Sequence, residues 1–258
     1  MSDDIVKSCA RVLEVLGLFS ECKRSLKASE ICQQLGYPKS SANALLKSLV
    51  RLGFLSVDIE SIRYFPTLRI THLGDWIPAI LLGSGEASRM LQSLHTATHE
   101  TVTLSIQNGL SMEFIRVIVG IFPIALQMEE GCQVPLFGTC VGTAALTTKE
   151  DIVVHDLYNR AAVTQDGNHS LIPLKDVMLE VKLARARGYA ISYDGVFPDT
   201  GAVASPIFLP GGEHTLVLAA GGPTERITRS ESAIASELLR LRNEHRWRVK
   251  NSSKSVFK

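Results

Sequence analysis

The stretch from Ser25 to Arg69, SLKASEICQQLGYPKSSANALLKSLVRLGFLSVDIESIRYFPTLR, predicts two short helices joined by a tight turn. Ile31 and Leu35 stand four residues apart in a first helix over residues 28–35. A glycine follows at position 36 and can end this helix, because glycine takes a positive φ without strain. A proline at position 38 suits the first turn of the next helix, where its missing N–H costs nothing. The apolar face of that second helix consists of Ala42, Leu45, Leu46 and Leu49.

The opposite face of the second helix is polar and carries no carboxylate. No Asp or Glu occurs between Ile31 and Val57. A helix that lies against phosphates cannot carry carboxylates there without repulsion, whereas Ser, Asn and Lys reach phosphates and base edges. We expect Asn43 to read a base and Lys47 to contact a phosphate. The full set of predicted DNA-binding residues is Ser29, Lys39, Ser40, Ser41, Asn43, Lys47 and Arg63.

A hairpin is predicted directly after the second helix. Residues 54–57 alternate like a strand, residues 58–61 form a turn, and Arg63, Tyr64 and Phe65 return. A hairpin in this position is the wing of a winged helix-turn-helix, whose partner is double-stranded operator DNA. The alternative is a three-helix fragment of a larger α domain.

Composition indicates a globular protein with modest basic character at its N-terminus. The 258 residues carry a net charge of +1, and 45% of them are hydrophobic. The first seventy residues hold ten Lys or Arg and seven Asp or Glu, a difference of +3. This charge favours a specific DNA binder over a protein that coats nucleic acid without regard to sequence.

The cysteines and the apolar runs point to a cytoplasmic protein. Five cysteines without a CxxC pair indicate neither a disulfide framework nor a zinc site. The order HxxxHE at His95, His99 and Glu100 lacks a third metal ligand. We therefore expect no metal and no cofactor. No signal sequence and no run of 18 apolar residues are present, so no membrane association is expected.

The pattern of periodicities divides the chain into four parts: a DNA-binding domain over residues 1–70, a helical linker over 71–99, a second domain over 100–250 and a basic tail over 251–258. A helix over residues 5–20 precedes the helix-turn-helix, with an inward face of Val12, Leu13, Leu16 and Phe19. Pro78 and the sequence Gly83-Ser84-Gly85 interrupt the linker, and the latter is either a hinge or an ordinary loop.

The second domain is predicted to be α+β, with an antiparallel sheet flanked by helices. Strict alternation over residues 101–106 and the pair Asn108-Gly109 predict a hairpin with a type I′ turn. Thr228 with Glu231 predicts a capping box that begins the last helix. Further strands are expected over 112–119, 121–128, 189–193, 203–209 and 215–220, the last two joined through Pro210-Gly211-Gly212-Glu213, and further helices over 149–159 and 173–187.

Six segments in order give the chain a resemblance to the IclR family of bacterial transcriptional regulators over nearly its full length. They are SCARVLEVLGLF, LKASEICQQLGYPKSSANALLKSLVRLGFL, ETVTLSIQNG, GTCVGTAAL, ARARGYAISYDGVFPDTGAVASPIF and LAAGGPTERI. The resemblance implies a GAF-like second domain that binds a small-molecule effector, often an organic acid. It also implies a homodimer or homotetramer that represses or activates a catabolic operon in response to that effector.

The resemblance also implies the effector site. The residues that it points to are Gly138, Thr139, Cys140, Val141, Tyr193, Asp194, Ala202, Ala219 and Gly221. Family members that bind glyoxylate-like acids tend to have Cys, Ser and Ser where this chain has Ala202, Ala219 and Gly221, which predicts a larger or more apolar effector, such as an aromatic acid. The backbone N–H groups of residues 138–141 either hold the acid group at a helix start or serve close helix–sheet packing. A second departure is Lys27, which stands where the family often has a Ser or Thr helix cap.

Two alternative functions compete with a regulator. In the first, Cys140 is the nucleophile of an enzyme that retains a vestigial helix-turn-helix. A nucleophilic cysteine needs a nearby base, and His155 is the nearest histidine in sequence. A buried or ligand-lining thiol is the competing interpretation of Cys140, and no catalytic residue is predicted. In the second, the chain is an interaction module that dimerises through residues 5–19 and 70–99 without binding DNA.

Overall fold

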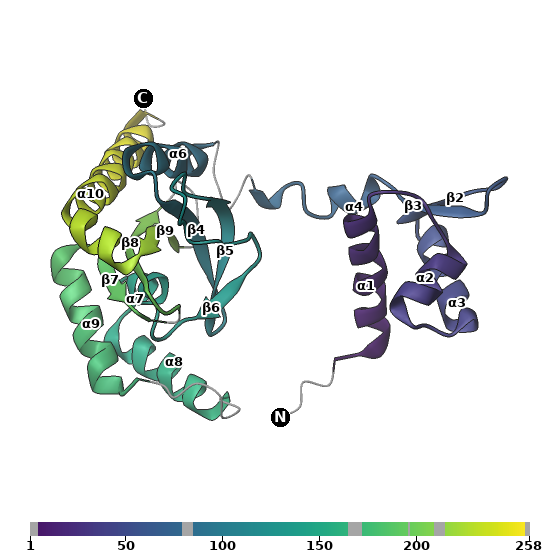
Figure 1. Cartoon of the computed structure of the whole chain (residues 1–258), viewed down its shortest axis with the longest axis horizontal. Coiled ribbons are helices and arrows are strands. Elements are labelled where there is room, and N and C mark those ends of the chain that lie inside the picture. The colour runs from purple at the N-terminus through teal and green to yellow at the C-terminus, as the bar shows by residue number, and fades with distance from the viewer. Residues whose placement is uncertain (1–4, 79–84, 165–171, 196, 209–214, 256–258) are drawn as a thin grey trace. The chain divides into compact units, whose positions relative to one another are not determined.

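The structure is a computed structural model that forms two compact units, Met1–Pro78 and Ala79–Lys258 (Figure 1). It describes residues 5–78, 85–164, 172–195, 197–208 and 215–255, with side chains up to residue 244. The predicted Gly83-Ser84 break and the turn over residues 210–213 lie outside the described residues. In the described part of the chain, no helix is both long and apolar enough to cross a membrane.

The first unit is a winged helix-turn-helix, as predicted. Its sheet has the strand order β1-β3-β2, and the wing is the antiparallel pair β2–β3. The pairing of Leu26 with Tyr64 adds the short strand β1, which the sequence analysis missed. The elements are α1 (Lys7–Cys22), β1 (Leu26–Lys27), α2 (Ala28–Leu35), α3 (Lys39–Arg51), β2 (Leu55–Asp58), β3 (Arg63–Pro66) and α4 (Arg69–His72).

The core of the first unit lies between α1, α2 and α3. Val15, Leu18 and Phe19 of α1 are buried with Ile31 and Leu46. The prediction that Leu13 belongs to this face is wrong, because Leu13 is 69% exposed. The buried stripe of α1 follows the spacing 15, 18 and 19, and position 13 lies on the opposite side of the helix.

The ends of α2 show how the chain compensates for the lysine at the cap position. Lys27 offers no side-chain cap, but its backbone N–H donates to Glu30 Oε2 at 2.7 Å, which is one half of a capping box. At the other end Gly36 has a φ of +67° and its N–H donates to the Cys32 carbonyl, as expected for a left-handed helix end.

The second unit is built on one six-stranded antiparallel sheet with the order β6-β5-β4-β9-β8-β7. Helices α6 and α10 cover one face; α7 covers the other, with α9 packed on α7 and α8 on α9 (Figure 1). This is the predicted α+β arrangement. The elements are α6 (Glu86–Thr98), β4 (Thr101–Asn108), β5 (Ser111–Ile118), β6 (Gln133–Pro135), α7 (Cys140–Leu146), α8 (Asp151–Thr164), α9 (Leu174–Arg187), β7 (Ala190–Tyr193), β8 (Thr200–Phe208), β9 (Thr215–Pro223) and α10 (Thr224–Ser255).

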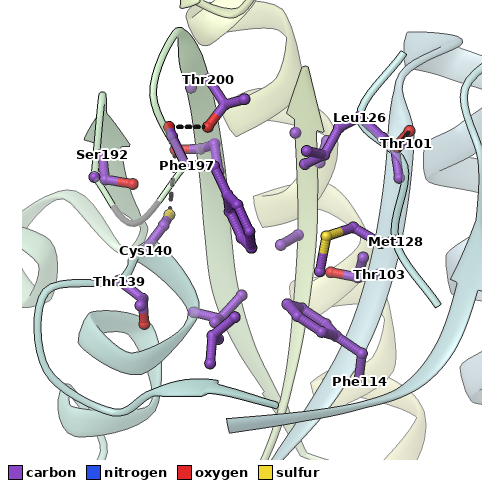
Figure 2. A pocket seen from close by; sticks show the side chains of 18 residues that line it. Thr101, Thr103, Phe114, Leu126, Met128, Thr139, Cys140, Ser192, Phe197 and Thr200 are labelled. Atoms are coloured by element: carbon purple, nitrogen blue, oxygen red, sulfur yellow. Dashed lines mark hydrogen bonds between the residues drawn. The ribbon is translucent and has the colours of Figure 1, made fainter. Parts of the chain in front are cut away.

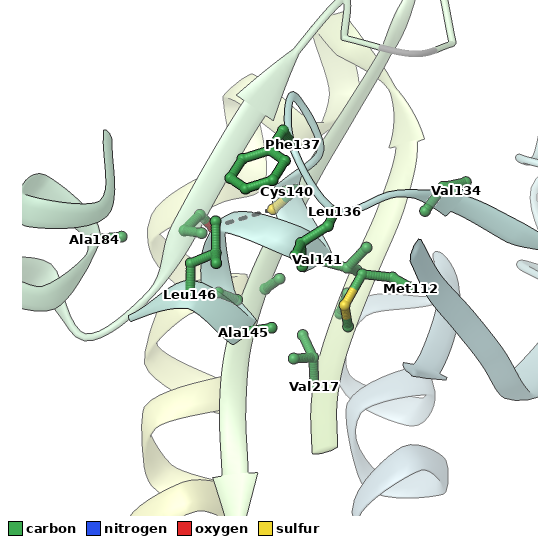
Figure 3. Close-up of a cluster of buried hydrophobic side chains, with 14 of the residues drawn as sticks. Met112, Val134, Leu136, Phe137, Cys140, Val141, Ala145, Leu146, Ala184 and Val217 are labelled. Atoms are coloured by element: carbon green, nitrogen blue, oxygen red, sulfur yellow. Dashed lines mark hydrogen bonds between the residues drawn. The ribbon is translucent and has the colours of Figure 1, made fainter. Parts of the chain in front are cut away.

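Two hydrophobic clusters fill the second unit, one on each face of the sheet. Val102, Leu104 and Leu218 point toward α6 and α10. The opposite face packs against α7, where Val141 and Leu146 lie among Met112, Val217 and other buried side chains (Figure 3). Because strand side chains alternate between the faces, β5, β8 and β9 contribute to both clusters.

Three local predictions in the second unit are wrong. Residues 121–128 form no strand; the third strand is β6, and the Thr101 hydroxyl holds the irregular segment by donating to the Leu126 carbonyl at 2.7 Å. The last helix begins at Thr224, so Thr228 lies inside it and donates to the Thr224 carbonyl. The hairpin after β4 does form, but Asn108 pairs with Ser111 and only Gly109 has a positive φ, as in a type II′ turn.

Candidate functional site: a DNA-reading helix and an apolar pocket

The polar face of α3 lies on the surface of the first unit. Lys39, Ser40, Asn43 and Lys47 are exposed and Ser41 is half-buried, whereas Ala42, Leu46 and Leu49 are buried. Lys39 opens the helix directly after the Pro38 cap position. The N-terminal half of α3 therefore presents the predicted DNA-contacting side chains together, and Ser29 of α2 is also exposed.

Arg63 makes contacts inside the unit. Its Nη1 donates to the Ser25 carbonyl at 2.9 Å and to Glu30 Oε2 at 3.2 Å. Arg24 pairs with the other oxygen of Glu30 at 2.8 Å. The backbone N–H of Lys27 and then the Arg24 guanidinium lower the pKa of Glu30. Arg63 thus ties the wing to α2, and its predicted contact with DNA stays a prediction.

The tip of the wing is acidic and apolar. Asp58 accepts hydrogen bonds from the backbone N–H groups of Ser61 and Glu60, at 2.7 and 2.9 Å, and these bonds lower its pKa. Ile59 at the tip is 91% exposed. A tip with ionised Asp58 and a neighbouring Glu60 is repelled by phosphates, so α3 is the better candidate for the main contact.

The second unit contains a pocket of about 70 Å³ over the sheet face that α7 covers (Figure 2). Its floor consists of small residues, because Ala202, Ala219 and Gly221 lie side by side on β8 and β9. A Cβ at Gly221 would meet Leu126 Cδ2 at 3.2 Å and leave less room. The small floor residues therefore create the space.

The walls of the pocket come from segments far apart in the sequence. Phe114 and Val134 rise from β5 and β6, and Leu126 and Met128 come from the segment between these strands. Figure 2 shows Phe197, from the connection between β7 and β8, directed into the same space. The remaining lining residues are Thr101, Thr103, Thr139, Cys140, Val141, Ser192, Gly195, Thr200, Gly201 and Ala220.

Cys140 is held as a neutral thiol at the start of α7. Its Sγ lies 3.2 Å from the Ala202 carbonyl oxygen and 3.3 Å from the Ala190 carbonyl oxygen, and its single S–H can donate to either. Burial raises the pKa of Cys140 to about 12. His155 is exposed on α8, and neither it nor any other basic side chain is among the described lining residues. A thiol in this state is a poor nucleophile near neutral pH.

Six of the nine predicted effector residues line the pocket, and three do not. Thr139, Cys140, Val141, Ala202, Ala219 and Gly221 contribute to the lining. Gly138 is not among the lining residues, the Tyr193 hydroxyl donates to Glu231 at 2.9 Å, and Asp194 accepts from the Thr224 hydroxyl at 2.9 Å. The threonines of β4 were missed, although the alternation over residues 101–106 already placed positions 101 and 103 on one face.

The segment between β5 and β6 is anchored beside the pocket by an ion pair. Arg226 of α10 binds both carboxylate oxygens of Glu100, whose side chain is 2% exposed. Its Nη2 also donates to the Ile124 carbonyl at 2.9 Å, and its guanidinium lies over the Phe122 ring. These contacts fix residues 120–126 to the junction of α6 and β4.

The three residues His95, His99 and Glu100 are used in packing. His95 Nδ1 lies 3.0 Å from the Glu100 carbonyl, and the His99 ring meets Phe122 edge-on. The side chain of Glu100 is taken by Arg226. No group of three or more His, Cys, Asp or Glu side chains is placed to hold a metal in the described part of the chain.

Comparison with known protein families gives two matches that together span most of the chain. Residues 8–58 match the IclR helix-turn-helix domain, and residues 84–244 match the family described as bacterial transcriptional regulator IclR C-terminal. The first matched segment runs from the second residue of α1 to the end of β2, and the second contains the whole pocket.

Similar proteins and solved structures agree with these matches. The HTH-type transcriptional regulator XynR of Escherichia coli (strain K12) is 23% identical over 91% of this chain and 93% of its own length. The Pca regulon regulatory protein of Pseudomonas putida is 23% identical over 88% of this chain and 78% of its own. The crystal structure of the Thermotoga maritima IclR matches the fold with a TM-score of 0.73 at 19% identity, over 94% of this chain and 98% of that one.

Proposed function

The chain belongs to the IclR family of bacterial transcriptional regulators, and we propose that a small molecule in the pocket over β4, β8 and β9 controls how α3 binds operator DNA. The observation that carries this proposal is the apolar pocket itself, which lies in the segment that matches the C-terminal family domain. A pocket lined mostly by apolar groups with a few polar ones is typical of a small-molecule site.

The DNA-binding part of the proposal rests on the exposed face of α3. Lys39, Ser40, Ser41 and Asn43 lie in the first turns of the helix, which is the part that enters the major groove in helix-turn-helix docking. We test it by titrating DNA from the region beside the protein's own gene at several salt concentrations. Affinity that falls steeply with salt and is lost in Lys39→Ala and Asn43→Ala supports the proposal; unchanged affinity in both variants overturns it.

The effector is expected to have a largely apolar body, because Phe114, Leu126, Met128 and Val134 surround the small floor residues. A thermal-shift screen of organic and aromatic molecules identifies it, since a ligand that binds only the folded state raises the unfolding midpoint. A hit whose midpoint shift disappears in Ala219→Leu binds in this pocket. A hit with an unchanged shift in that variant binds elsewhere.

The assembly is proposed to be a homodimer or homotetramer acting in the cytoplasm. A single helix-turn-helix makes few contacts, and two-fold operators require paired domains. From the apolar run of the linker we expect Ile77, Ile80, Leu81 and Leu82 to be buried against a partner or the second domain. Ile77 is 39% exposed in this chain, with Leu73 and Trp76 exposed nearby, and the other three lie outside the described residues. Light scattering that shows a monomer at micromolar concentration contradicts this proposal.

An enzyme that uses Cys140 is the weaker candidate. The thiol is buried with a raised pKa, and both of its short contacts are to backbone carbonyls. A nucleophilic cysteine instead needs a base within hydrogen-bond reach. If Cys140→Ala retains ligand-dependent DNA binding, the thiol serves packing; if the variant loses turnover of a bound ligand, the enzyme interpretation holds.

A further inference from the structure

Three hydroxyl side chains on β4 share the face that points toward α7 and the pocket, because alternate strand residues lie on one side. Thr101 uses its hydroxyl fully: it donates to the Leu126 carbonyl at 2.7 Å and accepts from the Gly120 N–H at 2.9 Å. Ser105 donates to the Val217 carbonyl at 3.5 Å. Thr103, between them, has no hydrogen-bond partner for its hydroxyl within the described ranges of the chain.

Thr103 is nonetheless buried. It is 6% exposed, and Figure 2 shows its side chain at the pocket beside Met128 and Phe114. Its Oγ1 is not among the fully buried side-chain atoms that lack a partner in the described part of the chain, so the oxygen remains accessible from the pocket. The Thr103 hydroxyl is therefore available to form a hydrogen bond with a molecule in the pocket.

The described lining of the pocket carries no charged side chain. Burial keeps Cys140 neutral. A carboxylate that entered this space would lose its hydration without gaining a cation, which is strongly unfavourable. At the start of α7 the Gly142 N–H is already taken, because the Thr139 hydroxyl accepts from it at 3.0 Å and donates to the Pro135 carbonyl at 2.8 Å.

We propose that the effector is an uncharged molecule with an apolar body and one hydroxyl, carbonyl or amide group that hydrogen-bonds to Thr103 Oγ1. This proposal rests on the proposed function, in which this pocket is the effector site. Thr103 is then the specificity-determining residue. It selects a ligand with one neutral polar group over a hydrocarbon, while the uncharged lining disfavours an acid of the same shape.

The size of the pocket limits the body of the ligand. Its volume of about 70 Å³ is roughly half of the ~150 Å³ of an engineered cavity that binds benzene. A branched molecule with a few carbon atoms enters without rearrangement. A ring-sized ligand requires Phe197, which points into the space, to move aside.

The test uses two pairs of probes that match in shape and differ in charge: isobutyramide with isobutyrate, and benzamide with benzoate. Calorimetric titration of the full chain measures the affinity for each probe at neutral pH. We expect the amide to bind at least about ten-fold more tightly than its carboxylate in at least one pair. A carboxylate that binds as tightly as its amide, or more tightly, overturns the neutral class of effector.

Three variants assign the effect to Thr103. Thr103→Val removes the hydroxyl and keeps the shape, so it should weaken amide binding about ten-fold without lowering the unfolding midpoint. Thr103→Ser restores the hydroxyl and should restore binding. Ser105→Ala is the matched control on the same strand face, outside the lining, and should bind as the wild type does.

The outcomes separate this inference from the function on which it rests. Amide binding that is unchanged in Thr103→Val overturns the role of Thr103. Binding of the carboxylates alone overturns the neutral class of effector and leaves the pocket as the effector site. Failure of all four probes to bind at millimolar concentration overturns this inference, whereas the proposed function fails only if no molecule of the thermal-shift screen binds in the pocket.

Discussion

Replacing Arg226 by Ala should destabilise the second unit and release the segment beside the pocket. The side chain of Glu100 is 2% exposed, and Arg226, at 28%, binds both of its carboxylate oxygens. Arg226 Nη2 also donates to the Ile124 carbonyl, and the guanidinium lies 4.2 Å from the Phe122 ring centroid. The variant would leave the Glu100 carboxylate buried without its partner.

The expected cost follows from the burial. Removing one partner of a buried ion pair costs about 3–5 kcal/mol, and the partial exposure of Arg226 places the value near the lower end, at about 3 kcal/mol. Arg229→Ala is the matched control on the same helix, because the Arg229–Glu225 pair is 77% and 87% exposed. An exposed pair of this kind contributes about 0–1 kcal/mol.

Urea unfolding of the full chain, followed by circular dichroism, measures both free energies. Hydrogen exchange reports on residues 120–126 directly, and their amides should exchange faster in Arg226→Ala than in Arg229→Ala. If the two variants differ by less than about 0.5 kcal/mol in the unfolding of the second unit, the Glu100–Arg226 pair does not hold this junction together.

Three further predictions concern the two sites. Asn43→Ala should lose about 1–3 kcal/mol of discrimination at one base position of the DNA site. Lys47→Ala should weaken binding to all DNA sequences alike and reduce the slope of log affinity against log salt concentration by about one; fluorescence anisotropy measures both effects. If Asn43→Ala weakens binding to every sequence equally, Asn43 does not read a base. Burial raises the pKa of Cys140 to about 12. Iodoacetamide at pH 8 should therefore alkylate the exposed Cys9 and Cys132 first, and Cys140 should react only near pH 12 or after unfolding. Mass spectrometry that finds Cys140 modified first would contradict this expectation. Ala219→Leu should fill the pocket, abolish ligand binding in calorimetry and cost at most about 1–3 kcal/mol of stability; unchanged ligand affinity would show that Ala219 lines no effector site.

The first unit could be predicted almost residue by residue because its signals are local. Gly36 ends α2 at a positive φ, Pro38 precedes α3, and the apolar spacing of α3 matches its buried side. The short strand β1 escaped prediction because two residues, Leu26 and Lys27, carry no periodicity and pair with β3 only in the folded unit.

The pocket was predicted in part, because its walls depend on contacts between distant segments. The small residues Ala202, Ala219 and Gly221 were found through the family resemblance, and they form the floor. Residues 121–128 contain enough apolar side chains to resemble a strand, but the Thr101 hydroxyl and the Arg226 guanidinium hold their carbonyls in place of a neighbouring strand. No local sequence pattern predicts hydrogen bonds between side chains and carbonyl groups that lie so far apart in the chain.

The start of the last helix was misplaced because its signal also depends on contacts between distant segments. Thr228 and Glu231 have the spacing of a capping box, yet Glu231 accepts hydrogen bonds from the Tyr189 and Tyr193 hydroxyls, at 3.0 and 2.9 Å. Tyr193 was assigned to the pocket through the family resemblance. Its hydroxyl is instead used to join β7 to α10.

The central claim is that occupation of the pocket changes the affinity of the chain for DNA. The direct measurement is the dissociation constant for the DNA beside its own gene, with and without a saturating ligand from the thermal-shift screen, in the wild type and in Ala219→Leu. We expect the ligand to change the constant by about 5- to 150-fold in the wild type and to leave it unchanged in the variant. A ligand that binds in the wild-type pocket and leaves the DNA affinity unaltered would contradict the claim.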